Sequence, residues 1–177
     1  TTTLLMSYVS LKAGDRVGLY TFDAKVGHYL PPKGGVQFHK VLTDFSGKID
    51  YSDSETNFTL GLSNLLQKLR RRSLVVVLTD FVDTVTAELM VQNLGRLSRK
   101  HVVMFVSLRD PDLAKVALAE PDNLFVMNRS VVAGTLLRTR ENVIRELRLH
   151  GIHPLDLPPE EIGPQAISRY LEIKRRE

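Results

Sequence analysis

The sequence predicts an α/β fold, with a mainly parallel, open sheet and helices on both of its faces. Short apolar runs, typical of strands that are buried on both sides, stand at residues 73–80 and 101–108. Apolar residues at helical spacing follow and precede these runs. Strands that alternate with helices form parallel sheets, because each crossover helix returns the chain to the same end of the sheet. A length of 177 residues fits a single domain over residues 1–177.

The first part of the chain is expected to hold a helix, a hairpin and two further helices. The alternating run 16–22 predicts a strand, and residues 25–30 predict a short antiparallel edge strand that ends at Pro31. Residues 36–45 predict a short helix, and the clearest helix of the chain begins at Phe58. The first eleven residues predict a helix whose apolar face is Leu4, Leu5, Tyr8, Val9 and Leu11.

The second part of the chain continues the alternation of strands and helices. Residues 112–151 are expected to be mostly helical, with breaks near Pro121 and Gly134. A last strand is expected over residues 152–157 and a last helix over residues 159–174. Residues 86–100 predict a helix whose buried stripe is Ala87, Met90, Leu94 and Leu97.

Composition excludes several classes of protein. The absence of cysteine excludes disulfides, thiolate zinc sites and cysteine nucleophiles, and it fits a cytoplasmic setting for the chain as supplied. No apolar run approaches the length of a membrane span, so we expect a soluble chain. The net charge of +4 suggests nucleic-acid binding through residues 70–72 as an alternative function. These cations also have a structural interpretation, because positive charges at the C-terminal end of a helix complement its dipole. We therefore expect no nucleic-acid partner.

Asp80 is the first candidate site residue, because it ends the apolar run of residues 73–80. In open α/β sheets, ligands bind at the carboxyl ends of the strands. Thr56 lies in a long polar loop ahead of the helix at Phe58, and such loops often carry function. The expected partner-binding rim consists of Thr56, Asn57, Asp80, Phe81 and Asp83.

Thr56 and Asp80 could also hold a hard divalent cation, directly or through water. The same residues have structural interpretations, in which Thr56 caps the next helix and Asp80 caps the loop after its strand. A second functional hypothesis is a magnesium-dependent phosphoryl-transfer or receiver-like domain that uses Asp80, with Asp83 and Asp110 as further acids. No P-loop and no nucleophile elbow is present, so we expect no enzyme of those classes and no catalytic residue.

His150 and His153 have a spacing that suggests a metal site. They straddle an expected helix end and strand start, so their rings need not converge. We expect capping or solvent-facing roles for both.

The order and spacing of several short motifs resemble a von Willebrand factor type A domain, and more closely the bacterial family called domain of unknown function fifty-eight. The similarity extends through nearly the whole chain. The motifs are Gly14-Asp15-Arg16-Val-Gly-Leu, Leu30-Pro-Pro, Thr56-Asn57-Phe58, residues 71–81, Arg109-Asp110-Pro111 and Tyr170-Leu-Glu-Ile-Lys174.

The resemblance implies a Rossmann-like fold with a metal-ion-dependent adhesion site. In such domains an Asp-x-Ser-x-Ser motif after the first strand supplies the main ligands, and Thr56 and Asp80 match the second and third positions. We expect this first motif to be absent from the sequence, because the chain opens inside what resembles the first helix, so we expect a central first strand to be missing and the site to be incomplete. Magnesium or manganese is expected in a complete parent protein, with no tight binding to this chain.

The resemblance also implies a protein-binding role, with a MoxR-type AAA+ ATPase as the partner, in the assembly of protein complexes. Many relatives resemble membrane-anchored proteins, which implies an anchored parent. A missing central strand leaves strand edges unpaired, so the neighbouring strands close directly, another copy supplies the missing strand in a homo-oligomer, or the fragment is metastable. We expect a rearranged or oligomeric sheet.

Overall fold

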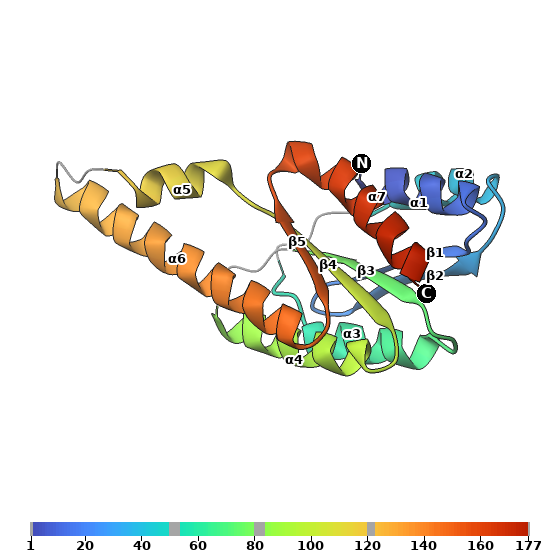
Figure 1. Ribbon diagram of the computed structural model, residues 1–177. Helices are drawn as coiled ribbons and strands as arrows, with labels where there is room; N and C mark the ends of the chain where they lie inside the picture. The colour runs from blue at the N-terminus through green and yellow to red at the C-terminus, as the bar shows by residue number, and fades with distance from the viewer. Residues whose placement is uncertain (1, 50–53, 80–83, 120–122, 177) are drawn as a thin grey trace. The chain divides into compact units, whose positions relative to one another are not determined.

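The computed structural model describes residues 2–49, 54–79, 84–119 and 123–176. It has mixed α/β architecture, as the sequence predicts. The chain forms two compact units. Unit 1 comprises Thr1–Arg70 and Glu160–Glu177, and unit 2 comprises Arg71–Pro159. The elements of both units are labelled in Figure 1.

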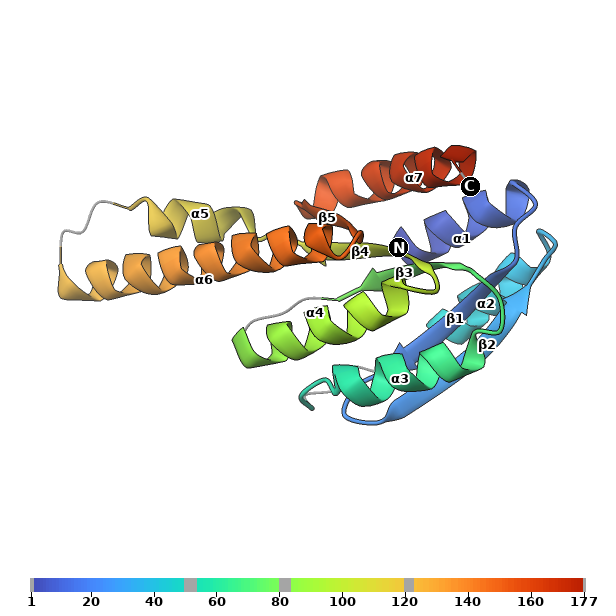
Figure 2. The same cartoon turned by 60° about the horizontal axis from the view of Figure 1, so that its bottom comes forward.

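Unit 1 is built around an antiparallel hairpin of β1 and β2, which pair from Val17 opposite Lys33 to Phe22 opposite Val26. The elements of unit 1 are α1 (Thr2–Lys12), β1 (Val17–Phe22), β2 (Val26–Lys33), α2 (Phe38–Ser46), α3 (Phe58–Lys68) and α7 (Pro159–Arg176). Figure 2 shows α3 alongside the hairpin, and α1 close to α2.

The two faces of β1 pack against different helices, because successive side chains of a strand point to opposite sides. Val17 and Leu19 pack against a buried cluster formed by Leu11 of α1 with Phe38 and Leu42 of α2. The alternate side chains turn to α3. The Tyr20 hydroxyl hydrogen-bonds to the Gly61 carbonyl at 3.1 Å, and the Phe22 ring meets Phe58 edge-on.

Unit 2 contains a three-stranded parallel sheet in the order β3-β4-β5. Its elements are β3 (Leu74–Leu78), α4 (Thr84–Ser98), β4 (Val102–Leu108), α5 (Pro111–Ala117), α6 (Leu124–Leu149) and β5 (His153–Leu157). The central strand β4 is buried over Val103–Ser107, as expected for a strand covered on both sides. Helices α4 and α6 pack against each other and against strands β4 and β5 (Figure 1).

The helix α4 has the buried stripe that its sequence predicts. Ala87, Met90, Leu94 and Leu97 are all essentially inaccessible to solvent. This stripe forms a large part of the core of unit 2.

Three local predictions are wrong. Strand β2 continues through Pro31 and Pro32 to Lys33, because an edge strand can place a proline where no hydrogen bond is required. Helix α6 runs without a break past Gly134, since tertiary packing outweighs the weak helix propensity of one glycine. The apolar face predicted for α1 is wrong in part: Leu11 is buried as predicted, but Met6 and Ser7 are buried as well, whereas Leu5 and Tyr8 are exposed.

The prediction of direct closure concerned the strands now labelled β1 and β3. The described strands form two sheets, one in each unit, so direct closure stays a prediction. The predicted single domain with a missing central strand stays a prediction.

Candidate functional site

The predicted rim falls partly outside the described residues. Asp80, Phe81 and Asp83 are not described, so their role stays a prediction. Thr56 is half-buried just ahead of α3. Asn57, not Thr56, is the N-cap of α3, because its side-chain Oδ1 accepts a hydrogen bond from the Leu60 N–H at 2.9 Å.

Among the described residues, no group of three or more histidine and acidic side chains is placed to hold a metal ion. The letters of the adhesion-site motif do occur once, at Asp50, Ser52 and Ser54. The sequence reasoning missed this occurrence. It precedes a helix instead of following a strand, and Asp50 and Ser52 lie outside the described residues.

Two other candidates have capping positions. Asp110 is the N-cap of α5, and its Oδ1 accepts a hydrogen bond from the Asp112 N–H at 2.8 Å. His150 is the C-cap residue of α6, and His153 is the first residue of β5. The two histidines therefore stand at a helix end and a strand start, as predicted.

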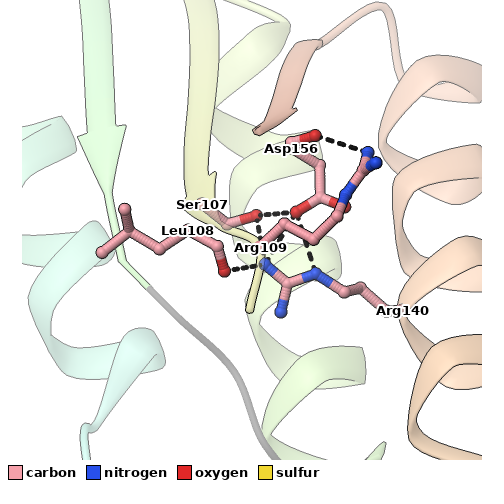
Figure 3. A network of polar contacts seen from close by, with 5 residues as sticks. All are labelled: Ser107, Leu108, Arg109, Arg140 and Asp156. Atoms are coloured by element: carbon pink, nitrogen blue, oxygen red, sulfur yellow. Dashed lines mark hydrogen bonds and ion pairs between the residues drawn. The ribbon is translucent and has the colours of Figure 1, made fainter. Parts of the chain in front are cut away.

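The most developed polar site in unit 2 lies at the carboxyl ends of β4 and β5 and centres on Asp156 (Figure 3). Ser107 of β4 is the direct neighbour of Asp156 in the sheet, and its Oγ donates a hydrogen bond to Asp156 Oδ1 at 2.8 Å. Arg140 reaches the same oxygen from α6, with Nε at 2.8 Å and Nη2 at 2.7 Å. Two strands and a helix thus converge on one carboxylate.

Arg140 is the inner arginine of this network. Its Nη2 also hydrogen-bonds to Ser107 Oγ at 3.0 Å and to the carbonyl oxygen of Leu108. The side chains of Arg140 and Asp156 are only 12% and 13% exposed. A charge pair that is removed from water needs such additional hydrogen bonds to offset its desolvation.

Arg109 is the outer arginine, and it belongs to the Arg-Asp-Pro motif. Its Nη2 donates to the Asp156 backbone carbonyl at 2.6 Å, and its Nε lies 3.3 Å from Asp156 Oδ2. Its side chain is 51% exposed. Within the described residues, its Nη1 has no hydrogen-bond partner.

The electrostatics of the site keep Asp156 ionised. Burial raises the pKa of its carboxyl, but hydrogen bonds from Arg140 and Ser107 and the positive charges of both arginines outweigh burial, so the pKa is lowered overall. Two guanidinium groups face one carboxylate, which leaves one net positive charge at this edge. The arrangement can therefore hold Arg109 in a fixed orientation and offer its free donors to an anionic group.

Exposed apolar side chains stand at the same edge of the sheet. Leu78 ends β3 and Leu108 ends β4, and they are 43% and 51% exposed. The sequence reasoning noted Arg109 as a family motif but missed Asp156 and Arg140. The available signal was an acid inside the short apolar strand His153–Leu157, where an unpaired charge would be costly.

Other family-like motifs have structural roles in unit 1. Asp15, in the turn between α1 and β1, accepts hydrogen bonds from the Tyr170 hydroxyl at 2.5 Å and from Lys174 Nζ at 2.7 Å. Lys174 Nζ also donates to the Ala13 carbonyl at 2.8 Å. Arg16 Nη2 donates to the Pro32 carbonyl at 3.0 Å. These residues attach α7 and β2 to the start of β1.

No helix in the described part of the chain is long and apolar enough to span a membrane. No curated protein and no solved structure matches the chain significantly. Residues 1–129 match the family described as "Protein of unknown function DUF58". The matched region is well over half of the 177 residues and contains the motifs around Asp15, Thr56 and Arg109. The protein therefore belongs to the DUF58 family.

Proposed function

We propose that this protein is a binding module that recognises another protein at the carboxyl edge of its parallel sheet. The observation that carries this proposal is the fixed, half-exposed guanidinium of Arg109 beside the exposed Leu108. Arginine and large apolar side chains are the residues that dominate protein interfaces when they come together. Ligands of parallel sheets also bind at this edge.

The chemistry of recognition follows from the network. Asp156 and its backbone carbonyl engage Nε and Nη2 of Arg109, so the guanidinium loses little freedom when a partner binds. Its Nη1 can donate to a carboxylate of the partner, while Leu108 supplies apolar contact. A charged hydrogen bond of this kind contributes about 1.5–3 kcal/mol.

The partner that we propose is a MoxR-type AAA+ ATPase, with a role in the assembly of protein complexes. The support is membership of the DUF58 family together with the sequence resemblance to von Willebrand type A domains. We further propose that Thr56 and Asp80 contribute to a magnesium or manganese site of such domains at the recognition surface. We propose no tight metal binding and no catalytic activity for the present chain.

The test is a binding titration of the purified chain with the MoxR-type ATPase encoded in the same genome, in which biolayer interferometry measures Kd. Arg109→Ala is expected to weaken Kd about tenfold or more, because 1.4 kcal/mol corresponds to a factor of ten. Arg145→Ala is the matched control. Arg145 is an exposed arginine of α6 that donates a hydrogen bond to Asn142, so this change should leave Kd unaltered.

Equal loss of affinity in both variants would indicate a general charge effect and contradict a specific role for Arg109. No binding of the native chain in either nucleotide state of the ATPase would contradict the proposed partner.

A further inference from the structure

Helix α6 exposes two different surfaces along its length. In its second half, the exposed positions carry charged or polar side chains, as expected of a helix that faces water, except for Leu149 at the helix end. The charged and polar positions are Arg138, Glu141, Asn142, Arg145, Glu146 and Arg148. In its first half, the exposed positions are mainly large and apolar. Compared with the second half, the first half of α6 therefore has an unusually apolar exposed surface.

The apolar residues of the first half form one surface, which we call the α6 patch. Leu124, Met127 and Val131 follow the i, i+3, i+7 spacing of one helix ridge, and Phe125 and Val132 form the adjacent ridge. Leu118, the C-cap residue of α5, is also strongly exposed. The exposed fractions are 84% for Leu118, 77% for Leu124, 68% for Phe125, 60% for Val131, 59% for Val132 and 49% for Met127.

Within unit 2, the start of α6 lies beyond the sheet, with α5 beside it (Figure 1). Helix α5 itself has no fully buried residue. Burial within unit 2 therefore does not account for the apolar side chains that these two helices expose. Exposed apolar surfaces of this kind mark interaction sites.

Charge on the α6 patch is sparse. From Leu124 to Val132, Arg129 is the single charged residue, and its guanidinium already lies over the Phe125 ring at 5.7 Å. Interfaces between identical subunits are more apolar and poorer in charge than those of transient complexes. A second copy of the chain thus fits this surface better than an acidic partner or an anionic membrane, which would call for several cations.

The area of the α6 patch also suits self-association. The five large α6 side chains of the patch expose about half or more of their surface and present about 500 Å² of apolar area, within the range of the largest patches on monomers. Two copies would then bury about 1,000 Å² in total, which reaches the lower limit of specific interfaces.

We propose that the protein forms a two-fold symmetric dimer in which the first halves of α6 from two copies pack antiparallel through the α6 patch. A two-fold axis places each ridge against its own copy, so one surface serves both subunits. This contact does not include the sheet edge where Arg109 lies. The dimer can therefore be tested independently of the proposed partner.

Sedimentation velocity of the native chain between about 1 and 100 µM is expected to show a species with twice the 20.0 kDa chain mass. The fraction of protein in this dimer should increase with concentration. Val131→Glu and Phe125→Glu should each give a monomer at every concentration, with an unchanged far-UV circular dichroism spectrum. Arg145→Glu, on the charged half of the same helix, should leave the dimer intact.

The absence of cysteine gives a second readout without background. Asn128 is an exposed residue at the middle of the α6 patch, where the two-fold axis brings it close to its own copy. An Asn128→Cys variant should therefore form a disulfide-linked dimer on mild oxidation, and an Asn142→Cys variant should not. A native chain that stays monomeric, a dimer that survives Val131→Glu, or an Asn128→Cys variant that does not cross-link would each overturn the proposal. A monomer that binds vesicles of phosphatidylglycerol through Phe125 would assign the patch to lipid and equally overturn it.

Discussion

Asp156 connects two arginines, a serine and two strands at the carboxyl edge of unit 2. Its carboxylate lies within 3.3 Å of donors from Ser107, Arg109 and Arg140. Arg140 is as buried as Asp156, so neither charge can be satisfied by water alone. Removal of one partner from such a pair leaves a buried charge without compensation.

Asp156→Asn is expected to lower the free energy of unfolding by about 3 kcal/mol at pH 7, because Arg140 would keep its charge in a buried position. The lowered pKa means that this stabilisation is present above the unfolded-state pKa of about 4 and is lost as the pH falls toward the folded-state value. Urea unfolding at several pH values should show the difference between the two proteins shrink in acid.

Asp112→Asn is the matched control. Asp112 pairs with Lys115, and both side chains are more than 70% exposed, so this change should have no measurable effect on unfolding. An Asp156 variant as stable as the native chain at pH 7 would show that the network contributes nothing to the fold.

His101 is a second residue with a measurable consequence. It is 5% exposed, and in the described part of the chain neither ring nitrogen has a hydrogen-bond partner. Burial lowers the pKa of its imidazole, and the neighbouring Lys100 lowers it further. The folded state therefore holds His101 neutral.

Stability should fall as the pH drops from about 7.5 toward 5.5. The imidazole of His101 binds a proton near pH 6.5 in the unfolded chain, whereas in the folded chain it stays neutral to lower pH. His101→Phe should flatten this dependence and cause little loss of stability, since both ring nitrogens are unsatisfied. Guanidinium unfolding at pH 5.5, 6.5 and 7.5 measures these slopes, and a His101→Phe slope equal to that of the native chain would refute the assignment.

At the scale of elements, the contact of α3 with β1 depends on a glycine. A Cβ atom on Gly61 would lie 2.1 Å from Cδ2 and 2.4 Å from Cγ of Phe22. The ring has little room to move, because it packs between Tyr20 and Phe58. Gly61 thus allows α3 to approach the hairpin closely.

Gly61→Ala should lower stability by about 2 kcal/mol through overpacking. Gly134 provides the matched control, because a Cβ added there meets no atom within 4 Å and the residue lies inside α6. Gly134→Ala should therefore raise stability by up to about 1 kcal/mol. Thermal unfolding of both variants at one protein concentration gives the comparison. Changes of the same sign would contradict this account of α3.

The order and type of the elements follow from local patterns in the sequence. The stripe of α4 from Ala87 to Leu97 and the apolar run of β4 are repeated signals, and both predictions are correct. The Arg140 network could not be predicted in the same way. It joins residues 16 and 33 positions apart on different elements, and no local period records such a contact.

At the scale of the whole molecule, motif residues far apart in the chain meet within each unit. In unit 1, Asp15 joins Tyr170 and Lys174 across more than 150 positions. In unit 2, Arg109 joins Asp156 across 47 positions. The first contact attaches α7, whereas the second leaves half of an arginine side chain exposed. The contact of Asp15 is therefore structural, whereas the half-exposed Arg109 is suited to recognition.

The central claim is that a protein partner binds at the carboxyl edge where Arg109 lies. Hydrogen–deuterium exchange of the chain, with and without the MoxR-type ATPase, tests it most directly. We expect the partner to slow exchange in the segment that follows Ser107, around Leu108 and Arg109, while the second half of α6 is unchanged. Binding that leaves the amides around Leu108 and Arg109 unprotected would contradict the claim.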